Sequence, residues 1–264
     1  MCPHCRAFIT TEDRVCPYCH EKVGARAADL REPGTILGGF IPHARYTTII
    51  ILLINFGMYA ATLALTPSVG ESGALQILGA KYGPWIWGGQ WWRLVTAGFL
   101  HGGLMHILMN SWVLFDLGAQ VEEVYGTNRM IVFYFLSTVG GFFASTLWSP
   151  RSLSVGASAG IFGLIGAMIA LGVRHRSALG DHIRGLYTRW AIYGLLFGFL
   201  PFFQIDNAAH IGGLAAGFGT AYIAGLPRIS GGTTEALWRV ISFVCLGITA
   251  LCFLQMYLWF AAQR

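Results

Sequence analysis

Long apolar stretches constrain the fold of this chain more than any other feature of its sequence. Seven of them follow the first 45 residues, at 47–65, 104–119, 130–148, 155–173, 190–204, 207–226 and 237–260. A helix needs about 20 apolar residues to cross a bilayer, and several of the stretches approach that length. With 55% hydrophobic and 11% charged residues, the chain is far more apolar than a soluble domain. The sequence therefore predicts an all-α membrane protein that crosses a lipid bilayer several times.

The positions of Lys and Arg predict how these helices are oriented. If the N-terminus is cytosolic, thirteen of the 17 Lys and Arg residues fall on the inner side, and the outer side holds Lys81, Arg93, Arg151 and Arg264. Short cytosolic loops are enriched in such residues. The densest group is the segment RHRSALGDHIRGLYTR, interpreted as a loop after the fourth stretch. We therefore attribute the net charge of +5 to membrane orientation and expect no nucleic-acid partner.

The start of the chain adds to this topology. Its first 22 residues are polar and show no secretory signal peptide. We expect a multi-pass integral membrane protein of a prokaryotic plasma (inner) membrane, with a cytoplasmic N-terminus and an external C-terminus.

Four of the six cysteines form two C-x-x-C pairs near the start of the chain, Cys2 with Cys5 and Cys16 with Cys19. This spacing allows four thiolates to surround one tetrahedral Zn²⁺ ion. A segment this short can bury almost no hydrophobic core. A structural metal would therefore supply most of its folding free energy. Disulfides or a redox C-x-x-C are the alternative, which the reducing cytosol disfavours.

The composition changes twice along the chain and suggests three parts. We predict a zinc-ribbon-like module over 1–22, a polar linker over 23–45 and a transmembrane domain over 46–264. The zinc ion would be structural, and the module could bind a protein partner that the sequence does not name.

Two polar residues lie near the predicted outer ends of apolar stretches. Ser158 lies about one helical turn into the stretch 155–173, and His210 lies at a similar depth in 207–226. Polar groups at membrane depth are costly and indicate functional sites. A serine hydroxyl becomes a nucleophile when a neutral imidazole accepts its proton. Each has a structural alternative, Ser158 as a small residue at a helix contact and His210 as an interhelical hydrogen-bond donor, but their matched depth favours a catalytic pair.

His106 and Asn110 are four residues apart and so share one helix face. Both can donate hydrogen bonds to the oxyanion that forms in acyl transfer, together with the first backbone N–H groups of the stretch 155–173. Asn110 could instead join helices. A further alternative is a transition-metal site formed by His101, His106 and His210. A metal transporter is disfavoured because the predicted bundle interior offers only one carboxylate, Asp116.

These residues occur in three motifs that resemble the rhomboid family of intramembrane serine proteases. The motifs are Trp92-Arg93 followed by His101-Gly-Gly-Leu-Met-His106-Ile-Leu-Met-Asn110, then Gly156-Ala157-Ser158-Ala159, and then Ala209-His210-Ile-Gly-Gly213-Leu-Ala-Ala-Gly217. They stand in the family's order and cover about residues 90–225. One departure is Ala159, where many members of the family have glycine.

The resemblance implies a rhomboid-like helical bundle of six plus one transmembrane helices. It implies hydrolysis of peptide bonds in or near transmembrane segments of membrane-protein substrates, through an acyl-enzyme intermediate and without a catalytic cofactor. Ser158 would be the nucleophile, His210 the general base, and His106 and Asn110 the oxyanion donors. A catalytically inactive relative that binds membrane proteins without cutting them is the alternative within the family.

Overall fold

The computed structural model describes residues 2, 5, 15–21, 45–175, 177–199, 205–225 and 233–262. The chain divides into two compact units, Met1–His43 and Ala44–Arg264. We describe each unit by itself. The finer boundaries expected at residues 22 and 45 stay predictions.

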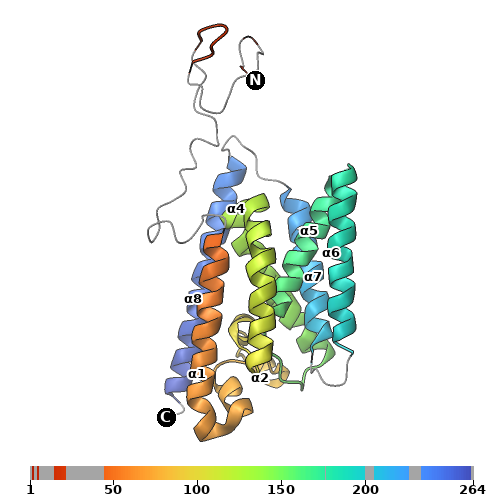
Figure 1. Cartoon of the computed structure of the whole chain (residues 1–264). Coiled ribbons are helices and arrows are strands. Elements are labelled where there is room, and N and C mark those ends of the chain that lie inside the picture. The colour runs from red at the N-terminus through yellow and green to blue at the C-terminus, as the bar shows by residue number, and fades with distance from the viewer. Residues whose placement is uncertain are drawn as a thin grey trace. The chain divides into compact units, whose positions relative to one another are not determined.

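The second unit is built from helices joined by loops (Figure 1). In chain order these are α1 (Tyr46–Ile77), α2 (Gly83–Trp87), α3 (Arg93–Thr96), η3 (Ala97–Phe99), α4 (Leu104–Trp148), α5 (Ser158–Arg174), α6 (Ala178–Phe197), α7 (Asn207–Ala224) and α8 (Thr233–Ala261). The expected all-α class is confirmed.

Two of the expected stretches, 104–119 and 130–148, form the single element α4, which reverses direction at Gly126. This glycine has φ 78° and ψ 161°, a conformation that side chains with a Cβ rarely adopt. Before it, the hydroxyl of Tyr125 donates to the carbonyl of Ala167, deep in α5, at 3.1 Å. After it, the chain returns to Gly141, which packs against Ala159 in the first turn of α5. α4 thus supplies two antiparallel crossings, as the six-plus-one arrangement requires.

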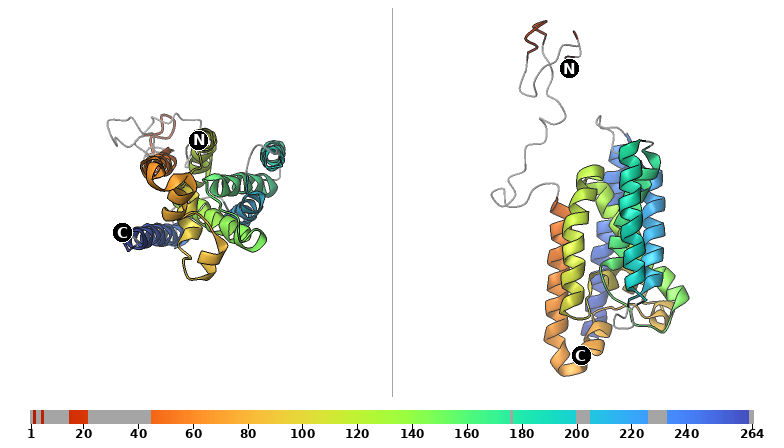
Figure 2. Two further views of the ribbon diagram at one scale, coloured as in Figure 1. Left: turned by 90° about the horizontal axis from the view of Figure 1, so that it is seen from below. Right: turned by 45° about the vertical axis from the view of Figure 1, so that its right-hand side comes forward.

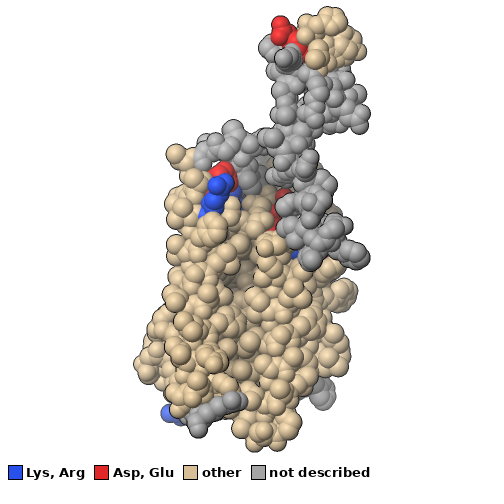
Figure 3. Space-filling view, turned by 90° about the vertical axis from the view of Figure 1, so that its left-hand side faces the viewer, with Lys and Arg blue, Asp and Glu red and all other residues tan. Residues whose placement is uncertain are grey.

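Among the described residues, length and composition identify three helices that could cross a membrane, α1, α4 and α8. α5 is also apolar but has only 17 residues. Figure 3 shows one face of the molecule, on which Lys, Arg, Asp and Glu side chains gather toward the ends of the helical unit. The band between them carries no charged side chain on this face, as expected for a surface in contact with lipid.

α6 corrects the interpretation of RHRSALGDHIRGLYTR as a loop. The helix begins at Ala178, well inside this segment, and the Ser177 side chain accepts a hydrogen bond from the Gly180 N–H at 3.2 Å. Asp181 and Arg184 form an ion pair of 3.2 Å on the helix surface. The segment looked like a loop because it is polar, but a capping serine and helix-spaced charges stabilise a helix there.

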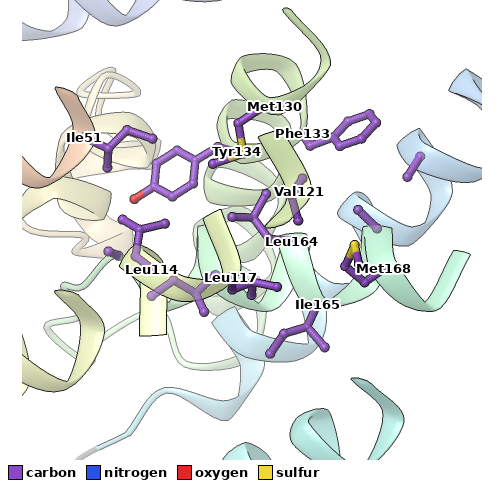
Figure 4. Close-up of a cluster of buried hydrophobic side chains, with 14 of the residues drawn as sticks. Ile51, Leu114, Leu117, Val121, Met130, Phe133, Tyr134, Leu164, Ile165 and Met168 are labelled. Atoms are coloured by element: carbon purple, nitrogen blue, oxygen red, sulfur yellow. The ribbon is translucent and has the colours of Figure 1, made fainter. Parts of the chain in front are cut away.

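α5 lies in the core of the bundle, in contact with α4, α6 and α7. Viewed along the helices, α1 and α8 lie on one side and α6 on the opposite side (Figure 2). Leu164 and Ile165 of α5 join Leu117 and Val121 of α4 in the main apolar cluster (Figure 4). The helix that begins with Ser158 is therefore held from several sides.

Candidate active site

Close packing between α5 and α7 fixes the relation of Ser158 to His210. A Cβ on Gly213 would clash with the carbonyl of Ala159, and a Cβ on Gly217 would clash with the carbonyl of Gly163. Both contacts advance by four residues on each helix, so the two helices run parallel in a fixed register. Because these residues have small or absent side chains, the helix backbones can approach each other closely.

Ser158 and His210 lie in the first turns of these parallel helices. Ser158 is the first residue of α5, which corrects the expectation that it lies one turn inside the helix. His210 is buried, and its ring stacks on Phe162 with centroids 4.0 Å apart and planes 12° apart. Phe162 follows Ser158 by one helical turn, so the imidazole lies against the α5 face that carries the serine. The structure thus brings the two predicted residues to facing helices at similar depth.

His106 and Asn110 both point at the backbone that precedes Ser158. A Cβ on Gly156 would lie 2.7 Å from His106 Nε2 and 3.5 Å from Asn110 Nδ2. Gly156 has φ 134°, so only glycine fits without strain and without displacing these side chains. Asn110 Nδ2 is buried and donates to no acceptor among the described residues. An unused buried donor beside the serine is the arrangement that an oxyanion site needs.

The N-terminus of α5 adds backbone donors to this group. The first N–H groups of a helix have no carbonyl acceptor one turn earlier, and here they include the N–H of Ser158 itself. The helix N-terminus also carries a partial positive charge, which favours an oxyanion.

Among the described residues, no carboxylate accepts a hydrogen bond from the imidazole of His210. Asp206 caps α7 by accepting from the Ala209 N–H at 3.0 Å, and its other oxygen accepts from the Ser145 hydroxyl. Asp206 thus ties the start of α7 to α4. His210 Nδ1 has no hydrogen-bond partner in the described part of the chain. Among the described residues, Asp206 therefore serves the packing of α7 and is not hydrogen-bonded to the imidazole of His210.

The loop between α1 and α4 holds the backbone in front of Ser158. The carbonyl of Ala97 accepts from the Gly156 N–H at 3.0 Å, and His101 Nε2 accepts from the Ala157 N–H at 3.5 Å. Further along, Lys81 Nζ donates to the Ser149 carbonyl at 2.6 Å and to Ser152. Burial lowers the pKa of this lysine, although the charge of Asp206 acts in the opposite direction.

Arg93 stabilises the loop between α1 and α4 from inside. Its side chain is fully buried. Its guanidinium donates to the carbonyls of Gln76 and Ala80 at 2.8 and 3.0 Å and to Gln90 Oε1 at 2.6 Å. Burial lowers the pKa of Arg93. Arg93 therefore acts as a structural residue inside the loop.

The first unit brings the four predicted cysteine ligands together. The sulfur atoms of Cys2, Cys5, Cys16 and Cys19 all lie within 4.8 Å of one another. The Sγ atoms of Cys2 and Cys19 are 3.7 Å apart, and those of Cys5 and Cys16 are 3.6 Å apart. These distances are far longer than a disulfide bond. They match the edge of about 3.8 Å in a tetrahedron with metal–sulfur bonds of about 2.3 Å. The residues therefore fit a tetrahedral metal ion.

A histidine metal site is not formed in the membrane unit. The rings of His101 and His106 meet edge to face at 5.1 Å, and His101 Nε2 is occupied by the Ala157 N–H. Over the described residues, the cysteine cluster is the one group of three or more His, Cys, Asp and Glu side chains that come together as potential ligands. The alternative metal site of His101, His106 and His210 is therefore not supported.

Comparison with known proteins agrees with this geometry. A family model described as a Rhomboid domain matches residues 88–227, which include the serine, both oxyanion candidates and His210. The chain belongs to the rhomboid family. That finding confirms the resemblance that the three motifs suggested and the six-plus-one helical fold that it implied.

Among the rhomboid relatives, two carry the word protease in their names. Rhomboid protease GluP of Bacillus subtilis is 36% identical over 174 residues, which cover 66% of this chain and 34% of GluP. Rhomboid-like protease 3 of Toxoplasma gondii is 38% identical over 145 residues, covering 54% of this chain and 55% of that protein. The chain thus spans about a third to about half of the length of these relatives.

A third relative has a different label. Inactive RHOMBOID-like protein 8 of Arabidopsis thaliana is 37% identical over 124 residues, covering 46% of this chain and 35% of that protein. Rhomboid membership and identity at this level therefore do not by themselves establish activity. Activity depends on the residues of the site.

The sequence did not single out some of the residues that shape the site. Phe162 could have been found, because it lies one helical turn after Ser158 and so shares its helix face. No sequence signal points to the Ala97 carbonyl or to Lys81, because they contact the segment before Ser158 from another part of the chain.

Proposed function

We propose that this chain is an intramembrane serine endopeptidase that hydrolyses peptide bonds in or near transmembrane segments of membrane proteins. Rhomboid membership supports an intramembrane protease function, and two relatives are named as proteases. The observation that carries the proposal is the parallel packing of α5 on α7, which holds Ser158 and His210 on facing first turns.

In this proposal Ser158 and His210 act as a catalytic dyad. His210 accepts the proton of the Ser158 hydroxyl as its oxygen attacks the scissile carbonyl carbon. The tetrahedral oxyanion receives hydrogen bonds from Asn110, His106 and the Ser158 N–H. The imidazolium then protonates the leaving amine, an acyl-enzyme forms, and a water molecule, deprotonated by His210, releases the acid. The acyl transfer uses no metal.

The orientation in the membrane is part of the proposal. Arginines cluster where α1 begins, where α4 reverses, where α5 ends and where α6 and α8 begin, namely Arg45, Arg129, Arg174, Arg184 and Arg239. We infer that this end is cytoplasmic, so that Ser158 and the C-terminus of α8 lie toward the external side. The bilayer and transmembrane substrates are the proposed partners, and a prokaryotic plasma membrane is the proposed location.

We also propose that Cys2, Cys5, Cys16 and Cys19 bind one structural Zn²⁺ ion. Thiolates in a tetrahedral arrangement suit zinc, which has no redox chemistry of its own at such a site. His20, directly after the second pair, has φ 59°, which allows the backbone to fold back so that its N–H donates to the Cys16 carbonyl at 2.9 Å. The module could bind a protein partner on the cytoplasmic side.

Labelling with a serine-directed fluorophosphonate tests the proposal, together with cleavage of a test transmembrane substrate. Wild-type protein should cleave and be labelled, whereas Ser158→Ala should do neither while keeping its expression and thermal stability. His210→Ala should be equally inactive, and the double variant no worse than either single variant, because the two residues act as one unit. Cleavage by Ser158→Ala near the wild-type rate would exclude the nucleophile, and an unlabelled, inactive wild type would favour the inactive-relative alternative.

A further inference from the structure

The last helix, α8, contacts the rest of the bundle through two matched aromatic anchors. Near its start, Trp238 packs against Phe133, with centroids 6.2 Å apart, and lies under the guanidinium of Arg129 at 5.2 Å. Near its end, Trp259 packs against Trp92 at 6.2 Å and lies under the guanidinium of Arg93 at 5.0 Å. Each anchor thus packs one indole of α8 against an arginine and at least one further ring.

The two arginines differ in what neutralises their charge. Arg129 forms a bidentate ion pair with Glu235, with N–O distances of 2.6 and 2.9 Å. Arg93 contacts carbonyl and amide oxygens only, and no carboxylate within the described ranges pairs with it. Three indoles surround its guanidinium instead, those of Trp85, Trp92 and Trp259, at 4.5, 4.5 and 5.0 Å. A buried cation without a counter-ion depends on such contacts more than a paired one does.

Of the two anchors, only the one at Arg93 lies in the loop between α1 and α4, which holds the backbone in front of Ser158. Arg93 begins α3, and four residues later the Ala97 carbonyl accepts the Gly156 N–H at 3.0 Å. Between them, the Thr96 hydroxyl donates to the Gly79 carbonyl at 2.8 Å, which ties the same turn to the end of α1. A displacement of Arg93 would therefore be transmitted to Gly156, against which His106 packs.

We propose that Trp259 is a positioning residue for catalysis. Trp259 belongs to α8, which carries none of the reacting groups. Its indole is the third ring that packs around Arg93, and it thereby holds in place the loop that aligns Gly156 and Ser158. This inference rests on the proposed protease function and adds a role for the seventh helix. Because a displacement of about 1 Å can reduce a catalysed rate on the order of a hundredfold, the effect should appear in turnover rather than in substrate binding.

Trp238 provides the matched control, since it makes the same kinds of contact from the same helix at the other anchor. The full chain is compared as wild type, Trp259→Leu, Trp259→Phe and Trp238→Leu. For each we would measure kcat and KM on a test transmembrane substrate, the rate of fluorophosphonate labelling at Ser158, and the thermal midpoint. Trp259→Leu should lower kcat and the labelling rate about tenfold or more with little change in KM. Trp259→Phe, which keeps a ring, should fall between it and wild type.

Trp238→Leu should lower the thermal midpoint while kcat at a permissive temperature stays near wild type. Equal losses of kcat in Trp238→Leu and Trp259→Leu, or an unchanged kcat in Trp259→Leu, would overturn the proposal. Should Trp259→Leu not fold, Trp259→Phe decides: a lower kcat at an unchanged midpoint supports the role, and a wild-type kcat excludes it. Wild-type protein that neither cleaves nor labels contradicts the protease function itself, whereas an active wild type with an unaffected Trp259→Leu contradicts only this inference.

Discussion

The imidazole of His210 lies flat on the ring of Phe162, with centroids 4.0 Å apart and planes 12° apart. The two side chains come from different helices, α7 and α5, and Phe162 stands one turn after Ser158. The stack therefore fixes the orientation of the His210 imidazole relative to the helix face that carries Ser158.

We predict that Phe162→Leu slows substrate cleavage and that Phe162→Tyr leaves it near wild type. An aromatic stack contributes about 0.5–1.5 kcal/mol, so losing it in the productive geometry should cost about two- to tenfold in kcat/KM. The measurement is steady-state cleavage of a test transmembrane substrate, with circular dichroism as a check of folding. Equal rates for Phe162→Leu and wild type would show that the stack does not position the base.

We predict that Asn110→Ala retains some activity, unlike the dyad variants. Removing one oxyanion donor costs about 10²–10³ in rate, because the remaining donors, His106 and the Ser158 N–H, survive. Single-turnover cleavage by folded protein measures this effect. A loss as complete as that of Ser158→Ala would assign Asn110 to the framework of the bundle instead.

We predict that Gly217→Ala disrupts the site, whereas Gly219→Ala on the same helix does not. A Cβ at Gly217 would clash with the Gly163 carbonyl and push α7 from α5, but a Cβ at Gly219 meets no atom within 4 Å. Overpacking costs about 1–3 kcal/mol, while alanine in a free helix position is slightly favourable. Thermal midpoint and kcat of the two variants test this, and similar values would contradict the close register of the helices.

We predict that Lys81→Met lowers the free energy of unfolding by about 1–3 kcal/mol, because the hydrogen bonds that the buried ammonium group donates to Ser149 and Ser152 are lost. Burial lowers the pKa of Lys81 in the folded protein below its ordinary value of 10.5. At a pH between these two values, Lys81 is more protonated in the unfolded chain than in the folded one. The free energy of unfolding attributable to Lys81 should therefore rise with pH in that window. Comparing denaturation of wild type and Lys81→Met across the window tests the sign, and parallel curves would refute it.

We predict that a strong chelator unfolds the cysteine module but leaves proteolysis within a few-fold of the untreated rate. Folding free energy in so small a module is mostly metal binding, and the proposed catalytic groups belong to the other unit. Metal analysis should find one zinc per chain, lost in Cys16→Ser. Complete loss of cleavage in Cys16→Ser, restored by no added metal, would instead indicate that the module is required for activity.

The sequence by itself determined the membrane character, the helical class, the three motifs and the four cysteines that come together. These follow from apolar length, from polar residues at membrane depth and from ligand spacing, all of which are local properties of the chain. The same local reasoning placed Ser158 one turn too deep and treated the first half of α6 as a loop, because a polar segment and a capped amphipathic helix have similar compositions.

Only the tertiary structure decided which groups surround Ser158 and His210. Three contacts join residues that are far apart in the chain or that face each other from separate helices. They are the stack of Phe162 on His210, the hydrogen bond from the Gly156 N–H to the Ala97 carbonyl, and the packing of buried Arg93 on Trp259. Such contacts depend on helix register and on the reversal of α4 at Gly126. The register of the helices and the reversal of α4 leave no periodic or compositional signal in the sequence, because both result from packing between segments.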